Sequence, residues 1–312
     1  MAEKPAIKIG YLKITDHLIL GVTDLKLKKG MEKFEHCTIE PVVKNGWNEV
    51  ADALSVKSLD GALVLAPTAM DLFKSGVDLK LLLLAHKSGS ILVKSKNAHI
   101  ETIEDFAGKT VLIPYQLSIH NMLFHKLLSE KGLKPGRSTE KGIDVILEVV
   151  APFQMPEALE YDEEGEIGGF IVAEPFGSQV IAQGHGEEFA LSKDLWPGHP
   201  CCVFVVRSEI IEKHPEAIQE ICTSFVKSGL AIDAQPEPAS VIGSDFLSQD
   251  KELIRKVLTM PPDRITTGEL FPVIEDLDTI QKYMMDKMKI MTSLIDLEKF
   301  VNTEFAIKAG AK

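Results

Sequence analysis

The stretch GALVLAPTAMDL, residues 61–72, decides the fold of this 312-residue chain. Its apolar run is unbroken as far as Pro67, which is typical of a strand buried on both faces of a parallel sheet. A helix is expected from about Thr68 to Gly76, because glycine commonly ends helices. The same order returns in GGFIVAEPFGSQVIAQG, residues 168–184. Two copies of one strand–helix pattern indicate two similar α/β units.

Strand and helix patterns alternate through most of the first two hundred residues. Further strands are expected at residues 6–12, 38–43, 109–114 and 143–150, and helices at residues 48–58, 119–130 and 153–159. Repeated strand–helix units form mainly parallel sheets with right-handed crossovers. After Pro200 one more strand, CCVFVVRSEII (201–211), precedes patterns that are largely helical, the last of them at residues 276–294.

This order predicts an α/β protein with two lobes, each a mixed, mainly parallel sheet flanked by helices. We expect residues 1–89 and 202–312 to form the first lobe, and residues 90–201 to form the second. A chain that leaves one lobe and returns needs two hinge strands, for which Ser90–Lys94 and Ser192–Val206 are the candidates. Such a double connection allows hinge closure on a ligand cleft between the lobes.

Composition and charge exclude several classes of function. The chain has 34 Lys and Arg against 46 Asp and Glu, a net charge of -12, and shows no basic cluster with interleaved aromatic residues. Nucleic-acid binding is therefore not expected. No apolar run approaches the roughly twenty residues that span a bilayer. We expect a monomer that works outside the cytoplasm if a signal peptide has been trimmed from it, and in the cytoplasm otherwise.

Polar residues follow several of the predicted strands. Ligands of open parallel sheets bind at the carboxyl ends of strands, so these side chains are expected to meet in the cleft. The candidate ligand-binding residues at strand ends are Thr15, Asp16, His17, Thr68, His86, Ser88 and Glu174. Glu174 either accepts a hydrogen bond from the ligand or bonds across the hinge.

A second set of candidates lies at helix starts. Ser118 is a natural N-cap, and the free amides of the helix that it begins form a ready anion site. His120 and Asn121 follow in the first turn, where the histidine could donate to an oxyanion or remain a structural residue. Trp47 precedes another helix and could form a wall of the pocket with its indole N–H as a donor.

The motifs of common enzymes and metal sites are missing from the sequence. There is no HExxH, P-loop or GxSxG, and the four cysteines do not form a disulfide framework. We therefore predict no catalytic residues, no cofactor and no metal. Cys201 and Cys202 are expected mainly as small core residues, with Cys202 also a candidate for contact with the ligand.

Four stretches together resemble one family. They are GALVLAPTAMDL (61–72), VLIPYQLSIHNMLFHKLL (111–128), GGFIVAEPFGSQVIAQG (168–184) and LWPGHPCCVFVVRSEIIEKHPEAIQEI (195–221). Their order and spacing resemble the nitrate, sulfonate, bicarbonate and taurine class of ABC-transporter solute-binding proteins, which are similar to thiamine-pyrimidine-precursor binders. The resemblance implies the periplasmic-binding-protein type II fold, capture of a small molecule without chemistry, and an ABC permease as partner.

One departure from that class affects the choice of ligand. Nitrate and bicarbonate binders typically carry a Glu-Lys pair after the HP of WPGHP, whereas this chain has Cys201 and Cys202. The expected cation is lost, which favours a small anionic or heteroaromatic organic ligand. The alternatives are a cytosolic enzyme of the same fold, resembling pyrimidine-precursor synthases or menaquinone-pathway enzymes and using Cys201, Cys202 and His120, or a cytosolic ligand sensor.

Overall fold

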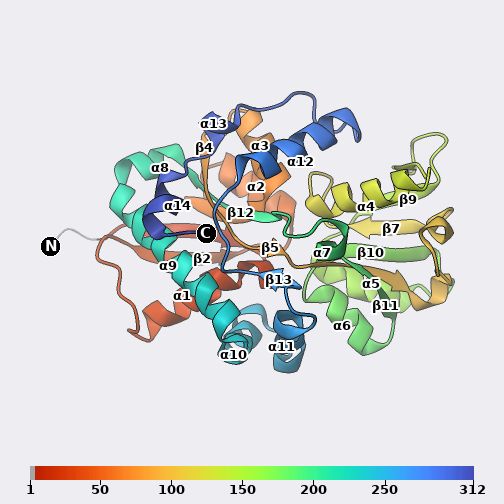
Figure 1. Ribbon diagram of the computed structural model, residues 1–312, viewed down its shortest axis with the longest axis horizontal. Coiled ribbons are helices and arrows are strands. Elements are labelled where there is room, and N and C mark those ends of the chain that lie inside the picture. Colours follow the sequence, from red (N-terminus) through yellow and green to blue (C-terminus); the bar gives the residue numbers. More distant parts are fainter. Residues whose placement is uncertain (1–3) are drawn as a thin grey trace.

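The structure is a computed structural model that describes residues 4–312, and it divides into two α/β lobes (Figure 1). The sheet of the first lobe has the order β2-β1-β3-β12-β4. Its strands are β2 (Thr38–Val43), β1 (Ala6–Tyr11), β3 (Gly61–Leu65), β12 (Cys202–Arg207) and β4 (Leu79–Leu84). β1 pairs in parallel with both of its neighbours, while β12 is antiparallel to β3 and β4. The strand β12 therefore belongs to the first sheet although it follows the second lobe in the chain.

The sheet of the second lobe has the order β11-β6-β10-β7-β9-β8. Its strands are β11 (Gly186–Leu191), β6 (Ser90–Ser95), β10 (Ile167–Ala173), β7 (Thr110–Ile113), β9 (Val145–Val149) and β8 (Pro135–Gly136). β10 runs parallel to β7 and antiparallel to β6. A small ribbon of β5 (Lys87–Ser88) and β13 (Ile265–Thr266) lies between the lobes (Figure 1).

Helices cover both sheets. They are α1 (Leu18–Lys28), α2 (Trp47–Ser55), α3 (Ala66–Lys74), α4 (Ile119–Glu130), α5 (Met155–Tyr161), α6 (Phe176–Gln183), α7 (Ser192–Leu195), α8 (Ser208–Lys213), α9 (Pro215–Ala234), α10 (Pro236–Leu247), α11 (Lys251–Thr259), α12 (Ile274–Asp286), α13 (Leu297–Phe300) and α14 (Glu304–Ala309). Short 3-10 helices occupy Thr15–His17, Lys96–Ala98, Ile103–Phe106 and Pro152–Gln154. Within the described residues, no helix is both long and apolar enough to cross a membrane.

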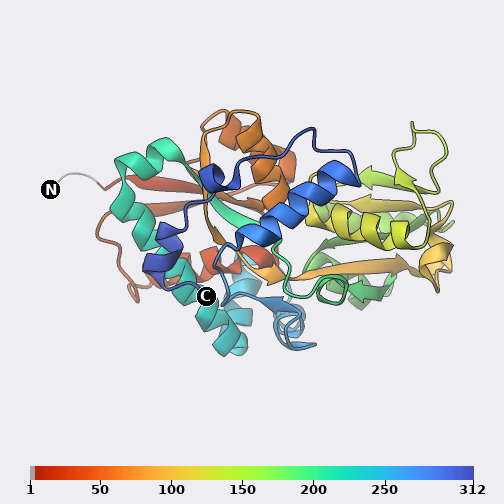
Figure 2. The ribbon, with the colours of Figure 1, turned by 45° about the horizontal axis from the view of Figure 1, so that its top comes forward.

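The C-terminal helices tie the two lobes together. α12 packs against α3 of the first lobe and α4 of the second, and α11 packs against α6 of the second lobe. Figure 2 shows α12, in blue, extending from the centre of the molecule along α4. This tail thus forms a third link between the lobes, in addition to the two crossings of the chain near residues 85–89 and 192–201.

The predicted elements agree with the structure in the repeated units and differ at the crossings. The strand at residues 38–43 and the helix at residues 119–130 have the predicted bounds. Ser90–Lys94, expected as a hinge strand, belongs to β6, which pairs with β10 and β11 in the sheet of the second lobe, and its role as a hinge stays a prediction. The helix expected at residues 276–294 is α12, which ends at Asp286, and the strand expected at residues 201–211 ends at Arg207, where α8 begins. α1 and β11 were not predicted, since neither has a strong period.

Gly169 in β10 is required by close packing of the backbone. Its φ is +153°, and a methyl group there would lie 1.9 Å from the carbonyl oxygen of Val93. We predict that Gly169→Ala lowers the free energy of unfolding by clearly more than the roughly 1–2 kcal/mol that an unfavourable φ alone costs. Urea unfolding measures this. Gly108→Ala is the matched control, because Gly108 also has positive φ (+82°) but no heavy atom within 4 Å of the added methyl; equal losses in both variants would contradict the packing argument.

Candidate functional site

The edge of the first sheet where β1, β3 and β4 end lies against the second lobe. The carboxyl ends of β1, β3 and β4 lie at one edge of the first sheet, and the antiparallel β12 brings its amino end to the same edge. Across the junction, Thr15 donates from its amide (2.8 Å) and its hydroxyl (2.9 Å) to the carbonyl of Glu174. The hydroxyl of Thr68 donates to the carbonyl of Leu117 at 2.8 Å. The lobes are therefore closed on each other in this structure, and both threonines bond to the opposite lobe.

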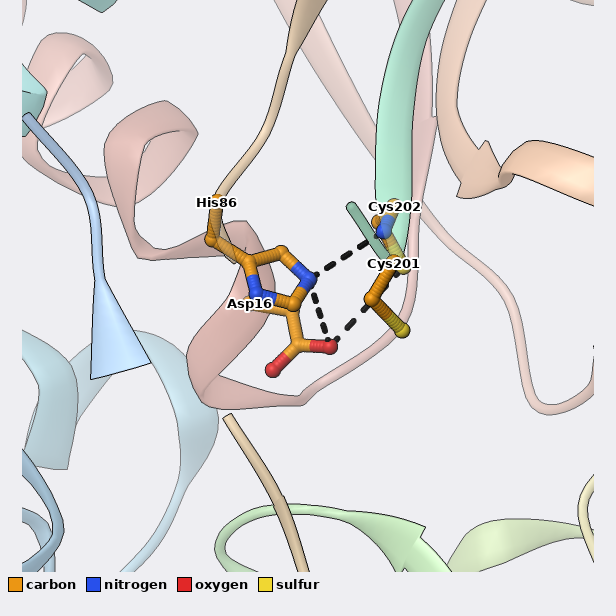
Figure 3. A group of neighbouring side chains, drawn as sticks. All are labelled: Asp16, His86, Cys201 and Cys202. Carbon is orange, nitrogen blue, oxygen red and sulfur yellow. Dashed lines mark hydrogen bonds and ion pairs between the residues drawn. The ribbon is translucent and has the colours of Figure 1, made fainter. Parts of the chain in front are cut away.

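The centre of the junction is a cluster of Asp16, His86, Cys201 and Cys202, all fully buried (Figure 3). Nε2 of His86 lies 2.9 Å from Oδ2 of Asp16. The backbone nitrogen of Cys202 lies 3.2 Å from the same Nε2, and its thiol lies 3.8 Å from Asp16 Oδ2. One ligand atom from each of the four residues fits within 4.8 Å of the others.

Strand geometry explains why two adjacent cysteines enter one cluster. Consecutive side chains within a strand point to opposite faces of the sheet. Cys201 stands just before β12, which begins at Cys202, and so it is free of this alternation. The carbonyl of Cys201 accepts from the amide of Ala66, and that of Cys202 accepts from the amide of Ala85. Both thiols are thus fixed beside His86.

The Asp16–His86 pair holds one titratable proton over a wide pH range. Burial raises the pKa of Asp16, because a carboxylate loses its hydration there. Burial alone would lower the pKa of His86, but the Asp16 carboxylate outweighs it and raises that pKa to about 10. Both directions follow if the two groups share a proton and stay neutral as a pair. A hydrogen bond from the Cys202 thiol lowers the pKa of Cys201 to about 7, and burial raises the pKa of Cys202.

Three further buried histidines surround this pair as neutral rings. Burial, reinforced by repulsion from His86, lowers the pKa of His17 to about 3. Burial also lowers the pKa of His120 to about 3 and that of His199 to about 4, and His86 contributes to both shifts. Because Nδ1 of His199 faces the carbonyl of Pro200 at 3.3 Å, the ring proton lies on Nδ1 and Nε2 is left as an acceptor.

The junction contains buried polar atoms that the protein does not satisfy. Among residues 4–312 they have no hydrogen-bond partner, and they come from both lobes: Oδ1 of Asp16, Nε2 of His17, Nε1 of Trp47, Nδ1 of His86, Nδ1 of His120, Oδ1 of Asn121 and Nε2 of His199. Trp47 and His17 are neighbours, with ring centroids 5.8 Å apart at 90°. Because unsatisfied buried polar atoms are costly and rare, their concentration here makes the junction the candidate binding site.

The Ser118 turn has the predicted capping geometry. The hydroxyl of Ser118 accepts from the amide of Asn121 (3.1 Å) and donates to the carbonyl of Tyr115 (2.7 Å). His120 Nε2 pairs with the hydroxyl of Ser90 at 2.9 Å, which leaves Nδ1 unpaired. The ligand contacts proposed for this turn remain predictions.

Glu174 bonds across the junction, one of the two roles expected for it. Its carboxylate accepts from the amide and hydroxyl of Ser178 and forms a buried ion pair with Arg264 from the C-terminal tail. Ser88 lies in β5, where its amide donates to the carbonyl of His199 at 2.9 Å. These two residues hold the junction together, and a ligand contact for either stays a prediction.

Sequence reasoning did not select Ser90, Cys201, His199 or Arg264 for the ligand site. His199 and Cys201 lie in the WPGHPCC stretch that carries the resemblance, which was a usable signal. Arg264 lies in the tail with no motif around it. The enzyme alternative paired the cysteines with His120, but the structure places them with His86 and Asp16, while His120 pairs with Ser90.

Comparison with known proteins identifies the family. The profile of the NMT1-like family matches residues 1–242. The chain belongs to the NMT1-like family. The nitrate import ATP-binding protein of Synechocystis sp. is 30% identical over 228 residues, which cover 68% of this chain and 33% of that protein. The chain spans about a third to a half of the length of the first curated relatives that it matches.

Two solved structures show the same architecture as this NMT1-like protein. The ligand-binding component of an ABC-type import system from Staphylococcus aureus, solved with zinc bound, superposes with a TM-score of 0.86 at 25% identity and covers 98% of this chain and 99% of that one. The periplasmic nitrate-binding protein of Synechocystis PCC 6803 gives a TM-score of 0.85 at 17% identity, covering 99% and 89%. The fold is that of periplasmic binding proteins, with mixed sheets flanked by helices.

The neutral histidines predict loss of stability in mild acid. A histidine in the unfolded chain has a pKa of about 6.5. Below that pH, His17, His120 and His199 are protonated in the unfolded chain but stay neutral in the folded protein. The free energy of unfolding should therefore fall from about pH 6.5 to pH 5, with each histidine adding up to about 1.4 kcal/mol per pH unit. His86 does not contribute to this loss, because its pKa in the folded protein is raised. The stability that its protonated form provides is lost only as the pH rises toward about 10.

Urea unfolding of the wild type and of His120→Gln across this pH range measures the effect. The variant should show a slope smaller by about one proton. An unchanged slope would mean that His120 takes up a proton without cost in the folded protein.

The Arg264–Glu174 pair predicts a large loss when one partner is removed. Both side chains are buried, at 3% and 0% exposure, so Arg264→Ala leaves an uncompensated carboxylate. We expect the free energy of unfolding to fall by about 3–5 kcal/mol. Adding Glu174→Gln to Arg264→Ala should recover part of this loss. Lys193→Ala, which removes an exposed pair with Asp263 at 3.0 Å, is the control and should change stability little; a similarly small effect at Arg264 would contradict the buried-pair argument.

Proposed function

We propose that this chain is the solute-binding component of an ABC-type importer, and that its lobes close over a small anionic or heteroaromatic organic molecule. The observation that carries the proposal is the set of buried, unpartnered polar atoms that both lobes bring to the junction. A molecule held there by hydrogen bonds would satisfy groups that the chain leaves unpaired. The fold and the family support this role, since the curated relatives include a nitrate/nitrite binding protein and a taurine-binding periplasmic protein.

The charges at the junction favour recognition by hydrogen bonds over recognition by a fixed cation. The Asp16–His86 pair is neutral overall, and His17, His120 and His199 are neutral at physiological pH. Arg264, at the edge of the junction, is already paired with Glu174. An inorganic anion would meet only neutral donors here, whereas an organic solute also gains from the Trp47 ring. This balance supports an organic solute with several hydrogen-bonding atoms.

The contacts between the lobes suit a binding protein that opens and closes. The junction is held by the buried Arg264–Glu174 pair, by the Lys193–Asp263 pair, by packing of the C-terminal helices on both lobes, and by hydrogen bonds such as those of Thr15 and Thr68. Each such bond contributes about 0.5–1.5 kcal/mol net, so a hinge motion can break them and a solute can restore the balance. We propose that the protein acts outside the cytoplasm and delivers its solute to a permease driven by an ATPase.

Trp47→Phe tests this function directly. The substitution keeps an aromatic ring but removes the buried indole N–H, which has no partner among residues 4–312. A thermal-shift screen of small carboxylates, alkylsulfonates, taurine, pyrimidines, nitrate and bicarbonate should first identify a solute that raises the melting temperature. Calorimetry should then show binding weakened about 3- to 10-fold in the variant.

Trp196→Phe is the matched control. Trp196 is half-buried at the second crossing, and the centroid of its ring lies 6.0 Å from that of His199. We expect this variant to bind the solute like the wild type. The proposal fails if no compound on the panel stabilises the protein, or if the two tryptophan variants lose affinity equally.

A further inference from the structure

Asp16, His86, Cys201 and Cys202 together supply the donors of a transition-metal site. An imidazole nitrogen, a carboxylate oxygen and two thiol sulfurs lie within 4.8 Å of one another, and all four side chains are fully buried. Four such ligands in a closed shell are typical of structural zinc sites, and thiolates select thiophilic ions over magnesium or calcium. We propose that this cluster binds one thiophilic divalent transition-metal ion, for which zinc and cobalt are the probes.

The spacing of the ligand atoms fits one small ion. Zinc–sulfur bonds of about 2.3 Å and zinc–nitrogen or zinc–oxygen bonds of about 2.0–2.2 Å place tetrahedral ligand atoms roughly 3.3–3.8 Å apart. His86 Nε2 and Asp16 Oδ2 are closer than this, at 2.9 Å, and the Cys202 sulfur lies 3.8 Å from the same oxygen. No separation within the set exceeds 4.8 Å. Movements of about 1 Å or less, within reach of side-chain rotation, would give tetrahedral geometry.

The cluster is poorly explained as core packing alone. Within the part of the chain that the structure describes, Asp16 Oδ1 and His86 Nδ1 have no hydrogen-bond partner although both are buried. Replacing a buried ion pair by apolar residues of similar volume is often neutral or stabilising, so such a pair brings little stability by itself. A metal ion would use the carboxylate, the imidazole and both thiols at once.

All four ligands lie at one edge of the sheet of the first lobe. Asp16 follows β1, His86 follows β4, Cys202 begins β12, and Cys201 directly precedes that strand at the end of the second crossing (Figure 3). The site is therefore complete without the second lobe, whereas His120 and Asn121, which belong to the proposed solute contacts, come from the second lobe. Metal binding thus goes beyond the proposed function and does not depend on it.

Cobalt binding tests the site. The purified full chain, stripped by a chelator under reducing conditions, is titrated with Co²⁺ and followed in the ultraviolet and visible. We expect one equivalent to produce a thiolate-to-cobalt charge-transfer band and the intense visible bands of tetrahedral cobalt, and zinc to abolish both. Cys201→Ser, Cys202→Ser and Asp16→Asn should each weaken binding by at least about 10-fold, since even residues that only support ligands have effects of this size.

Cys222→Ser is the matched control, because Cys222 is equally buried but lies in α9 outside the cluster. It should bind cobalt like the wild type. X-ray absorption of the wild-type zinc protein gives a second readout that needs no variant to fold, with the expected sulfur shell at about 2.3 Å and a nitrogen/oxygen shell at about 2.0–2.2 Å.

Two results would overturn the proposal: no thiolate band with Co²⁺, or a zinc site whose absorption spectrum contains only nitrogen and oxygen ligands. His120→Gln separates this inference from the proposed function. This variant should weaken solute binding and leave metal affinity unchanged. Solute binding and metal binding can therefore each be disproved without the other.

Discussion

The buried contact between Asp16 and His86 fixes the charge at the centre of the junction between the two lobes. It joins the end of β1 to the end of β4 across a sheet edge where solvent is excluded. A lone carboxylate could not remain charged there, and the imidazole beside it allows the two groups to hold one proton between them. Burial keeps His17, His120 and His199 neutral, and repulsion from His86 adds to the lowering of their pKa values.

That charge state distinguishes this junction from one built around a lysine or arginine. Neutral imidazoles and an indole N–H offer directional hydrogen bonds and little net field, while Arg264 at the edge of the site is paired with Glu174. The same arginine joins the C-terminal tail to the second lobe. In the proposed function, the neutral donors in the centre recognise the solute, while the charged pair at the rim helps to hold the lobes together.

Much of the fold could be predicted from the sequence, because its signals are local. The two stretches at residues 61–72 and 168–184, each a glycine, an apolar strand and a proline, predicted the repeated units. β2 and α4 have the bounds that their patterns indicate. Elements without a strong period, such as α1 and β11, escaped prediction. The pairing of Ser90–Ser95 with two other strands could not be predicted either, since it is a property of the sheet and not of the segment itself.

The candidate site was only partly predictable for the same reason. The rule that ligands bind at carboxyl ends of strands selected Asp16, His17 and His86, which the structure brings together. It could not show that an antiparallel strand would add Cys201 and Cys202 to the same edge, or that Arg264 from the tail would neutralise Glu174. These contacts join residues separated by about 90 to 190 positions in the chain, so no local sequence pattern predicts them.

Native mass spectrometry of the protein as purified, compared with the same sample after denaturation, tests the central claim most directly. If the junction is a binding site, the native chain should carry a discrete extra mass that is released on unfolding, or should acquire one equivalent when incubated with a panel of small solutes. Equal native and denatured masses under every condition would contradict the account and leave the buried polar atoms of the junction without a function.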